Sequence, residues 1–521
     1  SVASSTGEDS WVEALKAAEG KDFDAPRNKL WGGKGGGMDP DREANLLLLD
    51  WLEKNGVYIS EKSGWGEAPH ALGLSSETRD ENDDEPSGRG LIARKPVNDG
   101  EKLFSIPLNL CMTKEASQAT FGKDVITEST SEYIALALLL VHERYENGQK
   151  SFWWPYINIL PDTIEVNPSY TWSDDELALL EGSPAIVATM SMKNKLQKEY
   201  ANLMATTFSR NPRMFDTETV HTFAHFEWAF TMLFSRAIRL DNLSEGPAVS
   251  LVPYADLINH SPFSTAYINA QTGEKIAGGL FGQEDDTVVV FADRPFKKME
   301  QFFISYGQKS NAELLLLYGF SLDRNPFNSV EISVGLLEED PLYGEKFSFL
   351  QAAGRGDIEG QGLVFPLYND RYPNELLECL RMLCVTPSDL EKPGDWGQGT
   401  NMVPLSALDL TTPLDDANEA LVFEAIIEAC KLGLERYPTT EDDDTALMSD
   451  RQMFKGLPQN ARNAIRLRRT EKRLLKRTIA TSERRLVQIR TGVLDPTPQP
   501  WKLPPKRFDK LLDEIGVEIK P

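Results

Sequence analysis

Two polar motifs, roughly fifty residues apart, constrain the fold of this chain more than any other feature of its sequence. The first, at residues 251–261, is an apolar run that ends in Asn-His-Ser. The second, at residues 302–320, is a short strand-like run and a glycine, followed by a helix-forming segment between Tyr306 and Tyr318. Amide, imidazole and phenol groups add little to the packing of an apolar segment, because each needs a hydrogen-bond partner when it is buried. The two motifs therefore indicate a functional site.

The residue strings in these motifs resemble the C-terminal half of the SET domain, the fold of S-adenosylmethionine-dependent protein methyltransferases. Residues 256–261 read Asp-Leu-Ile-Asn-His-Ser, and residues 309–320 contain Lys-Ser-Asn-Ala-Glu-Leu and then Tyr-Gly-Phe. Both strings, in this order, are typical of the branch that includes the Rubisco large-subunit lysine methyltransferase. A Gly-Arg-Gly string at residues 88–90 resembles the N-terminal SET segment that turns against the cofactor, where glycine permits close backbone approach.

The resemblance implies an α+β fold, in which a β-rich SET core is split by a helical insertion and followed by an all-helical substrate-binding domain. We expect the SET domain at residues 41–330, its insertion at about residues 113–250, and the helical domain at residues 331–521. Residues 1–40 include a glycine-rich stretch and are predicted to be a flexible N-terminal segment. A chain of 521 residues is too long for a single hydrophobic core, which agrees with this division.

The spacing of apolar residues predicts helices in the insertion and in the C-terminal domain. The predicted helices cover residues 45–54, 133–145, 173–180, 191–206, 217–240, 374–384, 418–434 and 461–490. Residues 97–107 alternate apolar and polar side chains around an Asp-Gly pair, a pattern that predicts a β-hairpin. Residues 77–85 are mostly acidic and are predicted to form a solvated loop.

The composition of the chain restricts the partners that it is expected to bind. Its net charge is −25, whereas nucleic-acid binding needs a dominant basic surface, so we expect no nucleic-acid partner. The same charge favours the approach of a basic protein segment, although solubility explains an acidic surface equally well. No apolar run approaches the length of a membrane-spanning helix, and we expect a monomer that does not bind a membrane.

The few cysteines and histidines of the chain do not predict a metal site. None of the four cysteines forms a Cys-x-x-Cys pair, so we expect no structural zinc. His221 and His225 have a spacing that suits a metal on one face of a helix, but no third ligand follows, and we interpret them as structural. Sparse, unpatterned cysteines suit a reducing compartment, and the resemblance leaves plastid stroma, cytoplasm and nucleus open.

Methyl transfer to lysine requires an uncharged amine, and this requirement explains the residue types in the motifs. A lysine amine has a pKa of about 10.4, so its neutralisation at pH 7 costs about 4–5 kcal/mol. A narrow apolar channel helps because it disfavours the charged ammonium. Tyrosine hydroxyls at the end of such a channel stay neutral, since their own pKa is about 10, and they orient the lone pair of the amine.

The resemblance also assigns roles to individual residues. It makes Tyr306 the catalytic tyrosine, Tyr318 the second tyrosine of the channel, and Phe320 an aromatic wall beside the cofactor. The predicted contacts of S-adenosylmethionine are Gly88, Arg89, Gly90, Arg236, Asn259, His260 and Phe320. The predicted contacts of the substrate lysine are Arg236, Asp256, Tyr306 and Tyr318. Asparagine and histidine suit hydrogen bonding to a zwitterionic ligand, and arginine suits its carboxylate.

These residues favour a protein-lysine N-methyltransferase that acts on the exposed lysine of a non-histone protein, and two alternatives stay open. The first is a protein-histidine N-methyltransferase, an activity also found in this branch. An imidazole has a pKa of about 6.5 and needs little neutralisation, so a second tyrosine would be dispensable, and the presence of Tyr318 favours lysine. The second alternative is a catalytically silent SET-like scaffold that binds a partner through its helical domain.

The predicted helix at residues 461–490 is rich in arginine and lysine and contains only two acidic residues, Glu471 and Glu483. On a protein as acidic as this one, such a helix suits the docking of an acidic partner. Pairing with the acidic loops of the same chain explains the pattern at least as well. Both interpretations of this helix stay open at the level of the sequence.

Overall fold

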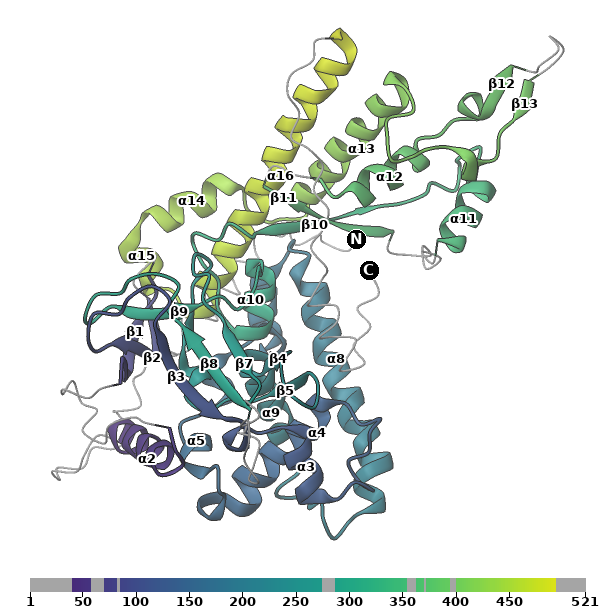
Figure 1. The fold of residues 1–521 in the computed structure, drawn as a ribbon. Coiled ribbons are helices and arrows are strands. Elements are labelled where there is room, and N and C mark those ends of the chain that lie inside the picture. The colour runs from purple at the N-terminus through teal and green to yellow at the C-terminus, as the bar shows by residue number, and fades with distance from the viewer. Residues whose placement is uncertain are drawn as a thin grey trace, which may run out of the picture.

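The computed structural model describes residues 40–57, 70–81, 85–273, 286–353, 362–369, 372–393 and 400–492. It has a strand-rich core, helices that pack on this core, and a largely helical C-terminal region that extends away from it (Figure 1). The predicted α+β class, with a helical insertion in the strand-rich part, is confirmed. The predicted flexible segment at residues 1–40 lies outside the described residues, apart from its last residue.

Small sheets form the strand-rich core, and they bring the sequence motifs together. The core strands are β1 Leu72–Arg79, β2 Pro86–Ala93, β3 Lys102–Pro107, β4 Ile238–Leu240, β5 Ala248–Ser250, β6 Asn259–His260, β7 Ile268–Gln271, β8 Thr287–Phe291 and β9 Gln301–Ile304. One sheet has the order β1-β2-β9-β6. In it, Phe302 of β9 pairs with Leu91 of β2, and Phe303 pairs in parallel with Asn259 of β6. The Gly-Arg-Gly, Asn-His-Ser and tyrosine motifs therefore lie on, or directly after, neighbouring strands.

The helices between β3 and β4 pack against this core. They are α3 Lys114–Phe121, α4 Glu132–Val141, α5 Trp154–Ile157, α6 Thr163–Val166, α7 Asp174–Leu177, α8 Ala185–Leu203 and α9 Phe223–Arg236. Every residue of α4 after Glu132 is buried, as expected for a helix that is apolar on all sides. α4 packs against α9, whose last residue, Arg236, reaches the core beside the Asn-His-Ser motif.

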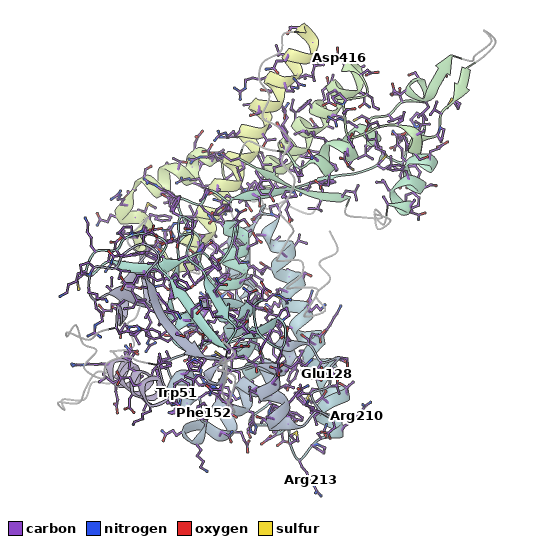
Figure 2. All side chains as sticks on the ribbon, in the orientation of Figure 1. Trp51, Glu128, Phe152, Arg210, Arg213 and Asp416 are labelled. Carbon is purple, nitrogen blue, oxygen red and sulfur yellow. The ribbon has the colours of Figure 1, made fainter. Side chains whose placement is uncertain are left out.

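Helix α2, Pro40–Lys54, precedes the core in the chain and packs against the insertion. Leu48 and Leu52 of this helix are fully buried. Its Trp51 meets Phe152 edge to face, with ring centroids 5.3 Å apart, and Figure 2 shows these two labelled side chains next to each other. α2, which contains the helix predicted at residues 45–54, is therefore an integral part of the folded core.

The C-terminal region has a hydrophobic core of its own. Its helices are α11 Tyr343–Ala352, α12 Asn374–Leu383, α13 Asp416–Glu435, α14 Glu441–Ser449, α15 Arg451–Gly456 and α16 Gln459–Thr491. Its strands are β10 Ser329–Val334, paired with β11 Leu363–Tyr368, and β12 Glu391–Pro393, paired with β13 Thr400–Met402. The prediction of an all-helical domain is therefore corrected to a mainly helical one. Every second residue of β10 is buried, which is the period of a half-buried strand.

Most of the predicted helices are present, but the predicted hairpin is wrong. The predictions at residues 45–54, 133–145, 191–206, 374–384, 418–434 and 461–490 correspond to α2, α4, α8, α12, α13 and α16. The helix predicted from residue 217 begins only at Phe223, because the Thr222 side chain caps it there. Residues 97–107 form no hairpin, since Val97 bridges Phe296 and β3 pairs with β8. The partner of β3 is distant in the chain, and a local pattern cannot reveal such pairing.

Helix α10, Asn311–Tyr318, follows β9 and carries the second tyrosine of the motif at its end. Ser310 and Glu313 form a capping box at its start, as the Ser-Asn-Ala-Glu string of the sequence permits. Gly319 ends the helix in the left-handed conformation, with φ at +74°. A Cβ atom at Gly319 would lie 1.7 Å from the carbonyl oxygen of Val166, so only glycine fits this turn.

We expect Gly319→Ala to destabilise the protein much more than Gly100→Ala. Both glycines have a positive φ, +74° and +72°, so both substitutions carry backbone strain of about 1–2 kcal/mol. At Gly319 the added methyl group also collides with Val166, whereas at Gly100 it meets nothing within 4 Å. Thermal unfolding of the two variants measures the difference. Equal shifts of the unfolding midpoint would contradict the close contact at Gly319.

Candidate active site

The side chain of Asn259, on β6, ties its own strand to the three other strands of the four-stranded sheet. Its Nδ2 lies 2.9 Å from Oγ1 of Thr78, 3.1 Å from the carbonyl oxygen of Arg89 and 2.9 Å from Oε1 of Gln301. The Gln301 amide in turn donates to the carbonyl of Arg79 at 2.7 Å. An amide group has two N–H donors, so three acceptors around one nitrogen hold Asn259 in a single orientation. The asparagine of the motif is thus a structural link between β6, β1, β2 and β9.

Gly90 of β2 lies directly against this asparagine. A Cβ atom at Gly90 would come within 2.7 Å of Nδ2 of Asn259, 2.8 Å of Thr78 and 2.9 Å of Gln301. No side chain fits in this space, which explains the glycine in physical terms. Gly88 has a φ of +70°, a conformation that glycine adopts without strain. Gly90 thus lets β2 approach its neighbours closely, whereas Gly88 is favoured by its backbone conformation and not by a close contact.

The Arg89 side chain points away from the two glycines. Its guanidinium donates to Asp41 at 2.6 Å and to Asn45 at 3.0 Å, both on α2, and to the carbonyl of Ile159 at 3.2 Å. Only the carbonyl group of Arg89 contacts Asn259. The side chain of Arg89 therefore anchors α2, and only the backbone carbonyl of this residue bonds to the Asn-His-Ser motif.

His260 is buried and is held in a single tautomer. The backbone N–H of Tyr306 donates to its Nδ1 at 3.1 Å, which leaves the ring proton on Nε2. The Ile304 carbonyl lies farther from Nδ1, at 3.4 Å. Nε2 has no hydrogen-bond partner among the described residues. Burial lowers the pKa of His260 to about 4, so the imidazole is neutral at pH 7.

Four aromatic rings form what we call the aromatic cluster: His260, Tyr306, Tyr318 and Phe320. The Tyr306 ring stacks on His260 and on Tyr318, with centroid distances of 4.9 and 5.0 Å. Phe320 lies 6.1 Å from Tyr318 and 6.4 Å from His260, also between ring centroids. Burial raises the pKa of both tyrosines, which keeps their hydroxyls protonated at neutral pH. The structure thus brings together residues from both sequence motifs.

The two tyrosine hydroxyls differ in their hydrogen bonding. The Tyr306 hydroxyl donates to the carbonyl of Ile258 at 2.7 Å, so its own proton is engaged and its lone pairs stay available to a ligand. The Tyr318 hydroxyl has no partner among the described residues. One phenol therefore presents an acceptor with a defined orientation, and the other keeps both its donor and its acceptor capacity.

Asp256 is a buried carboxylate beside this cluster. Its Oδ2 accepts a hydrogen bond from Tyr156 and lies 3.8 Å from the guanidinium of Arg236, which also donates to the Asp256 backbone carbonyl at 3.1 Å. Its Oδ1 and the Nε of Arg236 are buried without a partner among the described residues. Burial raises the pKa of Asp256 to about 6, although the positive charge of Arg236 opposes the shift. The predicted pair of charged residues is thus present as an incompletely satisfied ion pair.

Three contacts of this site were missed by the sequence analysis. Tyr156 donates to Asp256, and Thr78 and Gln301 hold Asn259. The Trp-Trp-Pro-Tyr string at residues 153–156 was a signal for Tyr156, because such a run of aromatic residues is rare. Thr78 and Gln301 sit in ordinary strand patterns, so no local feature of the sequence distinguishes them.

His221 and His225 do not share a helix face. His221 precedes Thr222, the cap of α9, and only His225 lies within the helix. Across the part of the chain that the structure describes, no group of three His, Cys, Asp or Glu side chains is placed to hold a metal ion. A search of the same residues for helices long and apolar enough to cross a membrane finds none.

We expect the imidazole of His260 to stay neutral between pH 8 and pH 5.5, because its pKa lies at about 4. Histidine-selective ¹³C labelling measures this directly, since the chain has only five histidines and His260→Gln assigns the signal. In the unfolded chain the imidazole titrates at about pH 6.5, so between pH 6.5 and pH 4 the unfolded state binds a proton that the folded state does not. The free energy of unfolding therefore falls as the pH drops through this range. A His260 signal that titrates with a midpoint near pH 6.5 would contradict the buried environment.

Comparison with known families identifies two domains in the chain. A SET domain matches residues 88–307, and a Rubisco LSMT substrate-binding domain matches residues 337–475. The Rubisco large-subunit N-methyltransferase of Pisum sativum is 31% identical over 371 residues, 69% of this chain and 70% of that protein. An aldolase-lysine N-methyltransferase of Arabidopsis thaliana is 29% identical over 408 residues, 75% of this chain and 76% of that protein.

More distant sequences and solved structures agree with this assignment. The actin-histidine N-methyltransferase of Homo sapiens is 27% identical over 76% of this chain and 64% of its own length. A crystal structure of the SET domain of LSMT bound to lysine and AdoHcy superposes with a TM-score of 0.68 and 27% identity, covering 87% of this chain and 94% of that one. The chain therefore belongs to the SET-domain protein-lysine N-methyltransferases of the Rubisco large-subunit methyltransferase family, with S-adenosylmethionine as methyl donor.

Proposed function

We propose that the enzyme methylates the side-chain amine of a lysine in a non-histone protein at the aromatic cluster. The observation that carries this proposal is the stacking of Tyr306 on Tyr318, 5.0 Å apart, next to the buried His260. This arrangement places two protonated phenols at the edge of an apolar, buried region. A lysine ammonium ion that enters such a region loses its favourable hydration. The protonation equilibrium therefore shifts towards the neutral amine.

The hydrogen bond of Tyr306 explains how the amine would be oriented. Because its hydroxyl proton is engaged by Ile258, the Tyr306 oxygen acts as an acceptor towards an N–H group of the amine. The lone pair of the amine then points away from the phenol. Fixing a nucleophile in a productive orientation removes a large entropic part of a reaction barrier, which we propose as the main contribution of Tyr306.

The residues of the site fit S-adenosylmethionine, whose amino-acid part carries a carboxylate and an amine. Buried polar atoms without a partner in the described chain occur on His260 (Nε2), Arg236 (Nε) and Asp256 (Oδ1). The first two are donors that suit a carboxylate, and the third is an acceptor that suits an amine. Gly88 leaves open space beside β2 where the cofactor is expected, since a Cβ atom there would meet nothing within 4 Å. When bound, the cofactor supplies the electrophilic methyl group. His260 and Arg236 would hold its carboxylate, and Asp256, predicted from the sequence as a contact of the substrate lysine, would accept a hydrogen bond from the cofactor amine.

The organisation of the chain and its place of action form part of the proposal. We propose a SET domain at residues 41–330, with its insertion at residues 113–250, and a substrate-binding domain at residues 331–521, in agreement with the two matched families. The plant relatives are named as chloroplastic enzymes that act on fructose-bisphosphate aldolase or on the large subunit of Rubisco. Their names support the plastid stroma as the compartment and a stromal protein as the substrate.

Replacing Tyr306 by phenylalanine tests the catalytic assignment. We expect Tyr306→Phe to lower kcat by about 100-fold or more, because the amine loses its acceptor, while the affinity for S-adenosylmethionine stays nearly unchanged. Tyr145→Phe is a matched control, since Tyr145 is a half-buried tyrosine that stacks on His225 near the opposite end of α9 from Arg236. Turnover measured with labelled methyl donor, together with calorimetry, gives both quantities. Unchanged turnover in Tyr306→Phe would refute the assignment.

The modified residue distinguishes lysine from histidine methylation. We expect that incubation of the protein with labelled donor and a plastid extract places the label on lysine Nζ, because two tyrosines are present to orient an amine. Mass spectrometry of the labelled peptides locates the methyl group. Label on imidazole nitrogen alone would favour the activity named for the actin-histidine relatives. Absence of both label and donor binding would favour a silent scaffold.

A further inference from the structure

The first half of α16 packs against the end of the helix that carries Tyr318. Asn463 of α16 is 1% exposed, and its Nδ2 donates to the carbonyl of Gly319 at 3.0 Å. Its Oδ1 accepts the backbone N–H of Ser321 at 3.2 Å, and the Ser321 hydroxyl contacts the same oxygen at 3.1 Å. The Ser321 hydroxyl also lies 3.0 Å from the carbonyl oxygen of Asn463. One asparagine therefore holds the backbone on both sides of Phe320.

This contact spans two regions of the chain. Tyr318 and Phe320 follow the stretch that matches the SET family, residues 88–307, and lie within the SET domain proposed above, whereas Asn463 lies in the stretch that matches the substrate-binding family, residues 337–475. Apolar contacts accompany the hydrogen bonds, because Leu315 of α10 and Ile465 of α16 share one buried cluster with Trp172 of the insertion. The turn after Tyr318 is thus held by a residue of the stretch that matches the substrate-binding family. Gly319 is also packed closely against Val166, which leaves the turn little room to move.

A second contact joins the same face of α16 to the strand that carries Gly88 and Gly90. The guanidinium of Arg466 pairs with Glu85, just before β2, and Nε of Arg462 lies 3.2 Å from the same carboxylate. Burial alone would raise the pKa of Glu85, but its hydrogen bond to Arg466 and that positive charge lower it. Positions 462, 463 and 466 lie on one side of a helix.

The prediction of a solvated acidic loop at residues 77–85 is therefore wrong at both of its described ends. Residues 77–79 belong to β1, and Glu85 is paired with α16. The basic helix predicted at residues 461–490 corresponds to α16, and most of its basic residues pair with acidic residues of the same chain. Residues with an acidic partner in the protein are Arg462, Arg466, Arg468, Arg469, Lys472, Arg473, Lys476 and Arg490.

We propose that Asn463 is a positioning residue for the active site: by holding the Gly319–Ser321 backbone it keeps Tyr318 and Phe320 in the aromatic cluster. The inference rests on the proposed roles of these two aromatic residues. Without Asn463, the turn keeps its glycine but loses hydrogen bonds on both sides of Phe320. The rings of Tyr318 and Phe320 then sample more orientations against Tyr306 and His260, and the site loses preorganisation.

The test compares Asn463→Ala with Ser183→Ala. Ser183 is buried and donates to Glu471 of α16 at 2.9 Å, so its loss weakens the packing of the insertion on the same helix without touching the Tyr318 turn. Both variants of the full chain are assayed well below their unfolding midpoints. For Asn463→Ala we expect kcat to fall about tenfold and the Kd for S-adenosylmethionine to rise about fivefold, with KM for the protein substrate nearly unchanged. For Ser183→Ala we expect wild-type values of all three.

Three results overturn the proposal. They are wild-type kcat and donor affinity in Asn463→Ala, equal losses of kcat in both variants, and a change of KM for the protein substrate alone. The donor affinity is measured by calorimetry and needs no methyl acceptor. It therefore tests the positioning role even if the methylated residue turns out to be histidine and the proposed function fails.

Discussion

The site depends on the pairing of β9 with β2 on one side and with β6 on the other. β9 runs antiparallel to β2 and parallel to the short β6, and the side chain of Asn259 fastens these strands to one another. Tyr306 is the second residue after β9, and His260 ends β6, so the same pairing sets the stacking of their rings. If this pairing were shifted by one residue, every side chain of β9 would change face, and the tyrosine would leave the site.

Burial and incomplete hydrogen bonding together give the site its chemical character. His260, Asp256 and Arg236 each have a buried polar atom that no described residue satisfies, and such atoms destabilise a fold unless a ligand satisfies them. Tyr306 and Tyr318 are protonated because burial disfavours the phenolate. The same burial disfavours the ammonium form of lysine, so a single physical effect keeps the phenols neutral and favours the reactive amine.

The sequence predicted the parts of the structure that depend on local chemistry. The apolar spacing of α4 and of α13 predicts helices, and the helix-forming residues between Tyr306 and Tyr318 predict α10. Long-range contacts were not predictable in this way. The pairing of β3 with β8, the turn of the Arg89 side chain towards α2, and the contact of Asn463 with Gly319 each join segments far apart in the chain. In each case the local sequence is compatible with several partners, and only the folded chain selects one.

Three distant segments form one site, in which we propose that the Tyr306 hydroxyl orients the amine of a substrate lysine. A crystal structure of the protein with S-adenosylhomocysteine and a lysine-containing peptide tests this arrangement. We expect a lysine Nζ within hydrogen-bond distance of the Tyr306 hydroxyl, and a cofactor amino-acid moiety that contacts His260 and the backbone of β2. A lysine amine bound away from both tyrosines, or a cofactor bound away from Asn259 and Gly90, would contradict it.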